Sequence, residues 1–208
     1  MSDDFVYDVT KFSIFTDVLE FKPWIDQITN DQTNLTCTTH SHQWNDLLGN
    51  KFEVLLTCSI NDQKINGEGF SVAGDPTQNL KAFSIANNKE VEFLRENFFK
   101  TFPGLVAYRA QNCLITTVNG QHFKDLIKLE YLDLSINKIE SIEGDSFKDL
   151  TKFERLNLKN NKIKKIDPNW FQSLQNLSRL FISENQIEML DEQVFDNLKN
   201  LGIIAVRY

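Results

Sequence analysis

Phenylalanine recurs at a fixed interval through the second half of this 208-residue chain. The residues stand 24 apart without a slip, at Phe99, Phe123, Phe147, Phe171 and Phe195. A constant period of this size predicts a solenoid, a stack of similar units that each bury their apolar side only against neighbouring units. We expect the phenylalanines to stack on one another as an aromatic spine inside this solenoid.

A pattern of apolar residues and asparagine keeps the same period. The unit with Leu129, Leu132, Leu134, Asn137 and Ile139 is followed by two matching units, and degenerate copies begin at Leu80 and Leu105. We expect each unit to form a short strand with inward apolar side chains, a turn, and a looser return segment. The asparagine stands at the turn, where its amide can satisfy backbone groups that would otherwise be buried unpaired. Cys113 fills this slot in one copy.

The repeated pattern resembles that of leucine-rich repeat proteins of the typical, 24-residue class, over about residues 79–208. The preceding part is similar to the N-terminal cap of secreted arthropod (insect) leucine-rich repeat proteins. The resemblance implies an α/β-type repeat solenoid, a curved horseshoe with a concave parallel sheet, preceded by a small β-rich N-terminal cap. We divide the chain into an N-terminal extension (1–34), the cap (35–78) and a solenoid (79–208) of about five repeats plus a partial one.

Two cysteines in the cap bear on the compartment of the protein. Residues 34–37 and 52–60 read as strands, and their alternation points Cys37 and Cys58 inward from neighbouring strands. A Cys37–Cys58 disulfide is one interpretation, worth roughly 3 kcal/mol for a loop of this length. Two buried free thiols are the alternative, and they would fit a reducing compartment.

Other compartment signals are mixed. The chain shows no signal-peptide pattern at its start, which taken literally favours the cytoplasm. Asn34 and Asn176 each begin an acceptor triplet for N-glycosylation, which is used only in the secretory pathway. The family resemblance favours an extracellular protein, and that is our expectation.

The strand residues that alternate with the inward apolar positions should face the concave side of the sheet. Over three such columns, five residues are basic and one is acidic, and two are large aromatics. Arginine and aromatic side chains are typical of interface hot spots. We therefore predict a partner-binding surface formed by Arg109, Tyr131, Asp133, Arg155, Lys159, Arg179 and Phe181. The alternative is an ordinary solvated sheet face of mixed polarity.

Charge and motifs exclude several classes of function. The net charge of −7 disfavours an electrostatic nucleic-acid binder, and no apolar run is long enough to span a membrane. His40 and His42 lie near Cys37 and Cys58, but their spacing matches no structural zinc pattern, so we assign them to a surface loop. No catalytic motif is present, and we expect neither an enzyme nor a cofactor.

These observations predict a protein–protein interaction module, secreted or resembling a receptor ectodomain, with a role in immunity or adhesion implied by the family resemblance. Its partner would be a protein, with an acidic surface to match the basic columns. An intracellular repeat scaffold without the disulfide is the alternative, and a structural matrix protein is a third reading. The partial last repeat, Val206–Tyr208, adds an expectation of self-association through an uncapped C-terminal end.

Overall fold

The computed structural model describes residues 38–45, 51–59, 81–89, 91–92, 94, 102, 104–190 and 192–206, with the backbone alone for the first two segments. The predicted N-terminal extension, Asn34, Cys37 and the boundary near residue 78 lie outside these residues. The side chain of Cys58 also lies outside them, so the predicted Cys37–Cys58 disulfide stays a prediction.

The described residues form short strands and two 3₁₀ helices. The strands of the main sheet are β1 (Thr38–Asn45), β2 (Lys51–Ser59), β3 (Ala82–Ser84), β4 (Ala107–Arg109), β6 (Tyr131–Asp133), β8 (Arg155–Asn157), β9 (Arg179–Phe181) and β10 (Ile203–Ala205). The return segments contain β5 (Thr117–Val118), β7 (Ser141–Ile142) and the 3₁₀ helices η3 (Pro168–Phe171) and η4 (Glu192–Phe195).

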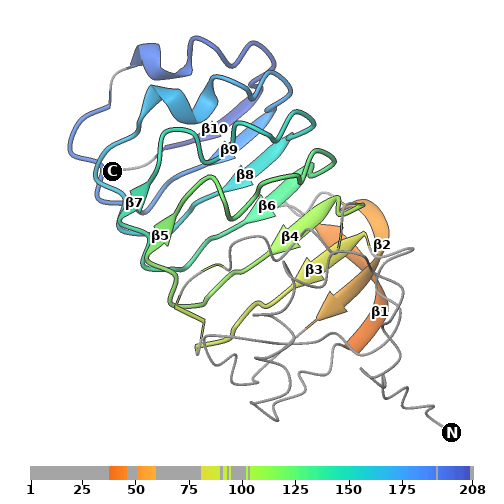
Figure 1. Cartoon of the computed structure of the whole chain (residues 1–208). Coiled ribbons are helices and arrows are strands. Elements are labelled where there is room, and N and C mark those ends of the chain that lie inside the picture. The colour runs from red at the N-terminus through yellow and green to blue at the C-terminus, as the bar shows by residue number, and fades with distance from the viewer. Residues whose placement is uncertain are drawn as a thin grey trace, which may run out of the picture.

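The main sheet runs in the order β1-β2-β3-β4-β6-β8-β9-β10, and every neighbouring pair except β1–β2 is parallel. Figure 1 shows these strands stacked along one side of the solenoid, with β5 and β7 along another side. The period of the sequence therefore produces one strand of the main sheet in each described turn of a parallel-sheet solenoid, which confirms the predicted fold class.

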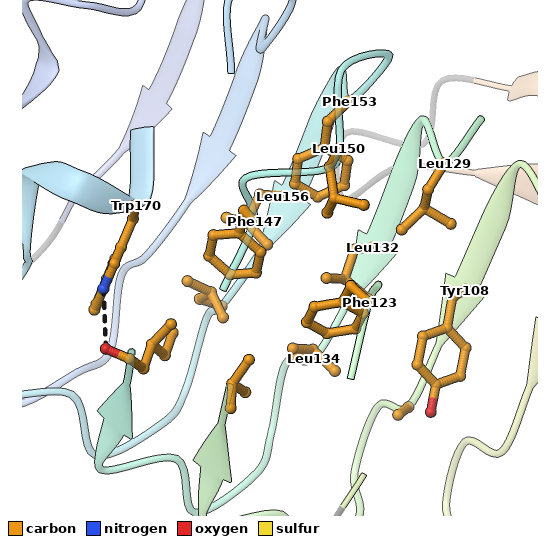
Figure 2. Close-up of a cluster of buried hydrophobic side chains, with 14 of the residues drawn as sticks. Tyr108, Phe123, Leu129, Leu132, Leu134, Phe147, Leu150, Phe153, Leu156 and Trp170 are labelled. Atoms are coloured by element: carbon orange, nitrogen blue, oxygen red, sulfur yellow. Dashed lines mark hydrogen bonds between the residues drawn. The ribbon is translucent and has the colours of Figure 1, made fainter. Parts of the chain in front are cut away.

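The apolar positions of the repeat form a single core between the main sheet and the return segments. Leu132, Leu156 and Leu180 occupy equivalent strand positions and are completely buried. Phe123 and Phe147 stack with ring centroids 5.8 Å apart, as the predicted aromatic spine requires, and Figure 2 shows them side by side. Each unit buries its apolar face against the next unit, so stability comes from stacking rather than from any single unit.

The repeated asparagine forms the predicted ladder of hydrogen bonds. Asn161 donates from Nδ2 to the carbonyl oxygens of Leu134 and Leu158, each at 3.0 Å, and accepts from the amide of Ile139 at 3.0 Å. Asn137 and Asn185 repeat this arrangement in their own turns. Because each asparagine links its own turn to the preceding one, it fixes both the turn and the stacking of the repeats.

Cys113 takes the place of asparagine in one turn and behaves as a weaker substitute. Its thiol is buried and lies 3.2 Å from the carbonyl oxygen of Ile85, in the preceding turn. A thiol is only a weak donor and a weak acceptor. Cys113 therefore keeps contacts of the ladder but makes them weaker than an asparagine does.

The residue before each ladder position has left-handed backbone geometry. This conformation, with φ between 56° and 63°, is adopted by Asn87, Asn112, Ile136, Asn160 and Glu184. Asparagine tolerates this region, but a β-branched residue is strained in it. Ile136 is the one β-branched residue among these five, and its backbone is therefore strained.

Backbone carbonyl groups of the small sheet of β5 and β7 accept hydrogen bonds from side chains of the next repeat. The Nε1–H of Trp170, in η3, donates to the carbonyl oxygen of Ile142 at 3.0 Å, as Figure 2 shows. In the preceding repeat, the hydroxyl of Ser146 donates to the carbonyl oxygen of Val118 at 3.3 Å. Side chains at one position of the repeat therefore satisfy carbonyl groups of these strands from the next turn.

The predicted cap strands need a correction. β1 covers Thr38–Asn45 and pairs antiparallel with β2, so His40 and His42 lie in a strand and our assignment of them to a surface loop is wrong. Their polar run resembles a loop in sequence, but β1 lies at the edge of the sheet, where polar residues are tolerated. β2 also pairs in parallel with β3, so this hairpin continues the solenoid sheet.

Candidate functional site

The predicted partner-binding residues fall into adjacent columns on the concave face, which we define as the side of the main sheet turned away from the core. Tyr131, Arg155 and Arg179 are in register across β6, β8 and β9. Arg109, Asp133 and Phe181 lie in the second column, on β4, β6 and β9. The structure therefore brings these residues together on one sheet face, with Lys159 just after β8. Their role in binding stays a prediction.

The first column of the concave face is buried over β3, β4 and β6. Ala82, Ala107 and Tyr131 are neighbours in the first column and form a buried apolar cluster separate from the main core. Tyr131 is only 3% exposed, although we expected an accessible aromatic anchor. Burial and the nearby carboxylate of Asp133 raise the pKa of Tyr131, so its hydroxyl stays protonated and donates a hydrogen bond.

Asp133 is the centre of a buried hydrogen-bond network. It accepts from the hydroxyls of Tyr131 at 3.0 Å and Ser135 at 2.6 Å, and from the side-chain amide of Asn157 at 3.0 Å. The backbone amide of Ser135 and the Arg109 guanidinium, at 3.0 and 3.8 Å, complete its surroundings. Because buried carboxylates are stable only when paired in this way, Asp133 holds the sheet face together. Sequence reasoning missed Ser135 and Asn157, and their places in the concave columns were the only signal for them.

The C-terminal half of the concave face is more open. Arg155 and Arg179 are direct register partners on β8 and β9, and both are partly exposed. A guanidinium nitrogen of Arg155 lies 3.7 Å from the carboxylate of Glu154, and its side chain keeps 15% of its surface exposed. The ammonium of Lys159 pairs with Glu184 at 2.9 Å. Arg155 and Lys159 therefore have acidic neighbours that the column count did not include.

Phe181 differs from the exposed anchor that we expected. It lies between Asn157 and Ala205 in register and is only 5% exposed. Side chains on one face of neighbouring strands stand about 5 Å apart and pack against one another, so a concave position does not ensure exposure. Phe181 contributes packing to this face and leaves only a small apolar surface for a partner.

The one predicted glycosylation residue that the structure describes is Asn176. Its side chain is exposed, and Nδ2 donates to the carbonyl oxygen of Thr151 at 2.8 Å. Asn200, one repeat later, donates in the same way to the carbonyl of Gln175 at 2.7 Å. Asn176 therefore has a structural role as a second link between repeats, which its acceptor triplet does not reveal, and its use for glycosylation stays a prediction.

Cys113 is a free cysteine inside the solenoid. Burial raises the pKa of its thiol, so the reactive thiolate is disfavoured. Chemical labelling of the folded protein should therefore report on Cys37 and Cys58, with little contribution from Cys113.

Three further expectations from the sequence concern metal binding, membrane spans and the C-terminal strand. In the described part of the chain, no group of three or more His, Cys, Asp or Glu side chains is arranged to hold a metal ion. Among the same residues, no helix has the length and apolar character to span a bilayer. At the C-terminal end, β10 pairs with β9 and Ile204 is 41% exposed. Self-association through this end stays a prediction.

Comparisons with known proteins agree with this architecture. The sequence profile of the family described as "Leucine rich repeat" matches residues 111–163 and 152–206. A similar solved structure is the crystal structure of a TLR13–ssRNA13 complex, with 26% sequence identity and a TM-score of 0.58. The match covers 61% of this chain and 18% of the TLR13 chain, so this chain spans about a fifth of that protein's length. Among curated proteins, none matches this chain significantly.

The periodic core, the asparagine ladder and the profile match together define the class. The part of the chain matched by this profile, residues 111–206, forms a solenoid of the leucine-rich repeat type with a parallel sheet on one side. Matches among solved structures are numerous, with 227 chains, so the likeness establishes this fold and leaves the partner to be inferred from the site.

Proposed function

We propose that this protein is a binding module that recognises a protein partner on the concave face of its solenoid. The observation that carries the proposal is the partly exposed patch on and after β8 and β9, where Arg155 and Arg179 are in register, Lys159 follows β8 and Phe181 lies in the next column. Arginines beside packed aromatic surface are common at the centres of protein interfaces. A rigid repeat scaffold presents such a patch with little loss of entropy on binding.

The proposal includes a place outside the cell and a role in immunity or adhesion. The cysteine pair of the cap and the exposed acceptor asparagine Asn176 support passage through the secretory pathway. Similarity to TLR13 supports a recognition role. The intracellular scaffold remains the alternative, and the state of Cys37 and Cys58 distinguishes the two.

A protein partner is favoured over a nucleic acid, although the TLR13 structure is a complex with ssRNA13. The net charge of this chain is −7. On the concave face, Asp133 neutralises Arg109 and Glu184 neutralises Lys159. A polyphosphate needs a continuous series of cations, and these acidic residues interrupt it.

The proposal is tested by a substitution that blocks the concave face sterically and leaves the charge of that face unchanged. Ser183 follows β9 on this face and is partly exposed, whereas Lys164 is exposed on the return segment. We expect Ser183→Trp to abolish capture of a partner by the folded protein, and the control Lys164→Trp to leave capture intact. Equal capture by the two variants, with unchanged thermal unfolding, would exclude the concave face as the binding surface.

The compartment is tested by alkylation of the folded protein, followed by peptide mapping without reduction. An extracellular protein made in a secretory host should show Cys37 bonded to Cys58 and no alkylation of either. Cys113 should react only after unfolding, since it is buried. Alkylation of both Cys37 and Cys58 in the folded protein would favour the intracellular scaffold instead.

A further inference from the structure

An asparagine is followed by a glycine in the return segment after β5, at Asn119 and Gly120. Asparagine is one of the chemically labile residues. Its side-chain amide carbon can react with the backbone nitrogen of the next residue, and glycine has no side chain to obstruct this approach. In the described part of the chain, Asn119 is the one asparagine that precedes a glycine, and the equivalent position of the next repeat holds Glu143.

We propose that Asn119 is a site of deamidation in the folded protein, with the backbone nitrogen of Gly120 as the nucleophile. That nitrogen forms a bond to Cγ of Asn119 while the bond from Cγ to Nδ2 breaks, and ammonia leaves with the proton that Gly120 gives up. The product is a succinimide ring. Water then adds to one of the two ring carbonyl carbons, the bond from that carbon to the Gly120 nitrogen breaks, and the nitrogen regains a proton. Residue 119 becomes aspartate or isoaspartate.

The turn holds the asparagine side chain in a conformation that suits this reaction. Oδ1 of Asn119 accepts a hydrogen bond from the backbone amide of Gln121 at 2.9 Å. This contact folds the side chain back over the backbone of its own turn, beside the peptide bond that joins Asn119 to Gly120. The same amide stabilises the negative charge that develops on Oδ1 when the nitrogen adds to Cγ. One hydrogen bond therefore both orients and activates the amide carbon.

The nucleophile and its surroundings are accessible. Among the described residues, none accepts a hydrogen bond from the backbone amide of Gly120. Asn119 and Gly120 are partly exposed, and Gln121 is exposed. Hydroxide can therefore remove the amide proton, and water can reach the ring that forms.

The stacking of the return segments favours a glycine at this place. A Cβ added to Gly120 would lie 3.2 Å from Oδ1 and 3.4 Å from the backbone oxygen of Asp145, in the next repeat. A Cβ added to Gly144 would meet Cβ of Asn169 at 3.2 Å in the same way. The close approach of successive turns thus leaves little room for a larger residue after Asn119, and the labile pair is a consequence of this packing.

The reaction would change a turn that is anchored beside the aromatic spine. The amide of Asn119 donates to Nδ1 of His122 at 3.1 Å, and the amide of His122 donates to the carbonyl of Asn119 at 3.3 Å. His122 is buried, and its ring meets that of Phe123 edge-on with centroids 6.3 Å apart. Isoaspartate adds a methylene group to the main chain and puts a carboxylate in place of this carbonyl. The modification therefore adds a negative charge and disturbs the closure of the turn.

Incubation of the full chain in buffer, at neutral and at mildly alkaline pH, tests the proposal. Peptide mapping by mass spectrometry then measures the conversion of Asn119 and separates it from that of Asn66, which also precedes a glycine in the sequence. The same chain unfolded in urea gives the reference rate. The Asn119→Asp variant supplies the reference peptide that distinguishes aspartate from isoaspartate.

The variants are Gly120→Ala and the matched control Gly144→Ala, which introduces similar crowding one repeat later but follows Glu143. The backbone of Gly120 lies outside the left-handed region, so alanine is compatible with it. The Asp145 side chain is 56% exposed and can move to make room. Circular dichroism and thermal unfolding check that both variants fold.

We expect Asn119 in the folded protein to convert within about ten-fold of its rate in urea, faster than any other described asparagine and with isoaspartate among the products. A reaction that waited for global unfolding would be slower by orders of magnitude, because only a minute fraction of the chain is unfolded. Gly120→Ala should slow the conversion by about ten-fold or more through the added Cβ, and Gly144→Ala should not.

Three results would overturn the inference: conversion more than about ten-fold slower in the folded protein than in urea, aspartate as the sole product, or an unchanged rate in Gly120→Ala. The first two use the unmodified protein, so the test stands even if an alanine variant fails to fold. The proposed partner on the concave face does not enter into any of these measurements.

Discussion

Single side chains set the geometry of each turn, and the asparagine ladder is the clearest case. Asn161 saturates its amide with two carbonyl acceptors and one backbone donor, all within a buried turn. The same three contacts in Asn137 and Asn185 show that the residue is needed for its shape as much as for its polarity. A residue of similar volume without the amide would leave these backbone groups unpaired.

Replacement of Asn161 by leucine should therefore lower the free energy of unfolding by about 1–3 kcal/mol, because buried backbone groups lose their partners. Urea unfolding monitored by circular dichroism measures the loss. The control is Asn160→Gly, at the exposed neighbouring position with φ of 56°, where glycine adopts the backbone without strain. A loss from Asn160→Gly as large as that from Asn161→Leu would contradict the ladder.

Ile136 has the opposite character, since its side chain is poorly suited to its backbone. Its φ is 57°, its side chain is β-branched, and it is 40% exposed. Equivalent positions in other repeats hold Asn112 and Asn160. We expect Ile136→Asn to raise the free energy of unfolding by about 1 kcal/mol through relief of strain.

Thermal unfolding of Ile136→Asn checks this gain. The control is Ile127→Asn, at another exposed isoleucine, which should change stability by less than about 0.5 kcal/mol. A lower unfolding temperature for Ile136→Asn than for the unmodified protein would show that the isoleucine contributes packing that outweighs its strain.

At the scale of elements, the return segments are joined by side chains as well as by strand pairing. β5 and β7 pair with each other. In the next turn, Trp170 in η3 donates to the carbonyl of Ile142. Asp167 caps η3 by accepting from the amide of Asn169, and Pro168 suits its first turn. The 3₁₀ helix therefore presents the indole to the strand carbonyl.

Trp170→Phe keeps most of the buried aromatic surface but removes the indole donor. We expect a loss of about 1–3 kcal/mol in the free energy of unfolding, because the carbonyl of Ile142 stays buried without that partner. Ser146→Ala is a graded comparison, since the carbonyl of Val118 keeps the amide of Glu143 as a donor at 3.0 Å. Equilibrium unfolding in urea should rank the tryptophan change as the more costly, and the reverse order would contradict this role.

For the whole molecule, the contribution of each repeat to stability should depend on how completely its phenylalanine is buried. Phe147 is fully buried and contacts Phe123 and Phe153 at 5.8 and 6.2 Å between centroids. Phe195, in η4, is only partly buried and contacts Phe171 at 5.7 Å. In a solenoid, each unit is stabilised only by its neighbours, so a unit whose phenylalanine is only partly buried opens more readily than one whose phenylalanine is fully buried.

Phe147→Ala should cost roughly 3–5 kcal/mol because it leaves a cavity in the middle of the stack. Phe195→Ala should cost less, about 1–2 kcal/mol, and should mainly increase local opening near β10. Hydrogen exchange and urea unfolding together separate these outcomes. Equal global losses from the two changes would indicate that the solenoid unfolds as one unit regardless of position.

The sequence alone determined the architecture of the described solenoid, because the positions that each unit needs for burial and for its turn recur at a fixed interval. The 24-residue spacing identified the units, and the apolar positions correctly identified Leu132, Leu156 and Leu180 as buried. The slot of Asn161 was assigned to the turn for the reason that the structure shows. The columns of the concave face were also predicted in their true register. All these features follow from local sequence patterns that recur in each repeat.

Only the tertiary structure decided which concave residues are accessible. Tyr131 and Phe181 are buried because side chains on adjacent strands fill the spaces between one another, and periodicity does not record their sizes. Asp133 became the centre of a network through Asn157, a residue 24 positions away. The strand that contains His40 depends on pairing with β2, which supplies hydrogen bonds that its own polar sequence does not predict. Contacts between units, rather than the pattern within a unit, therefore determined which residues of this face are buried and which are partly exposed.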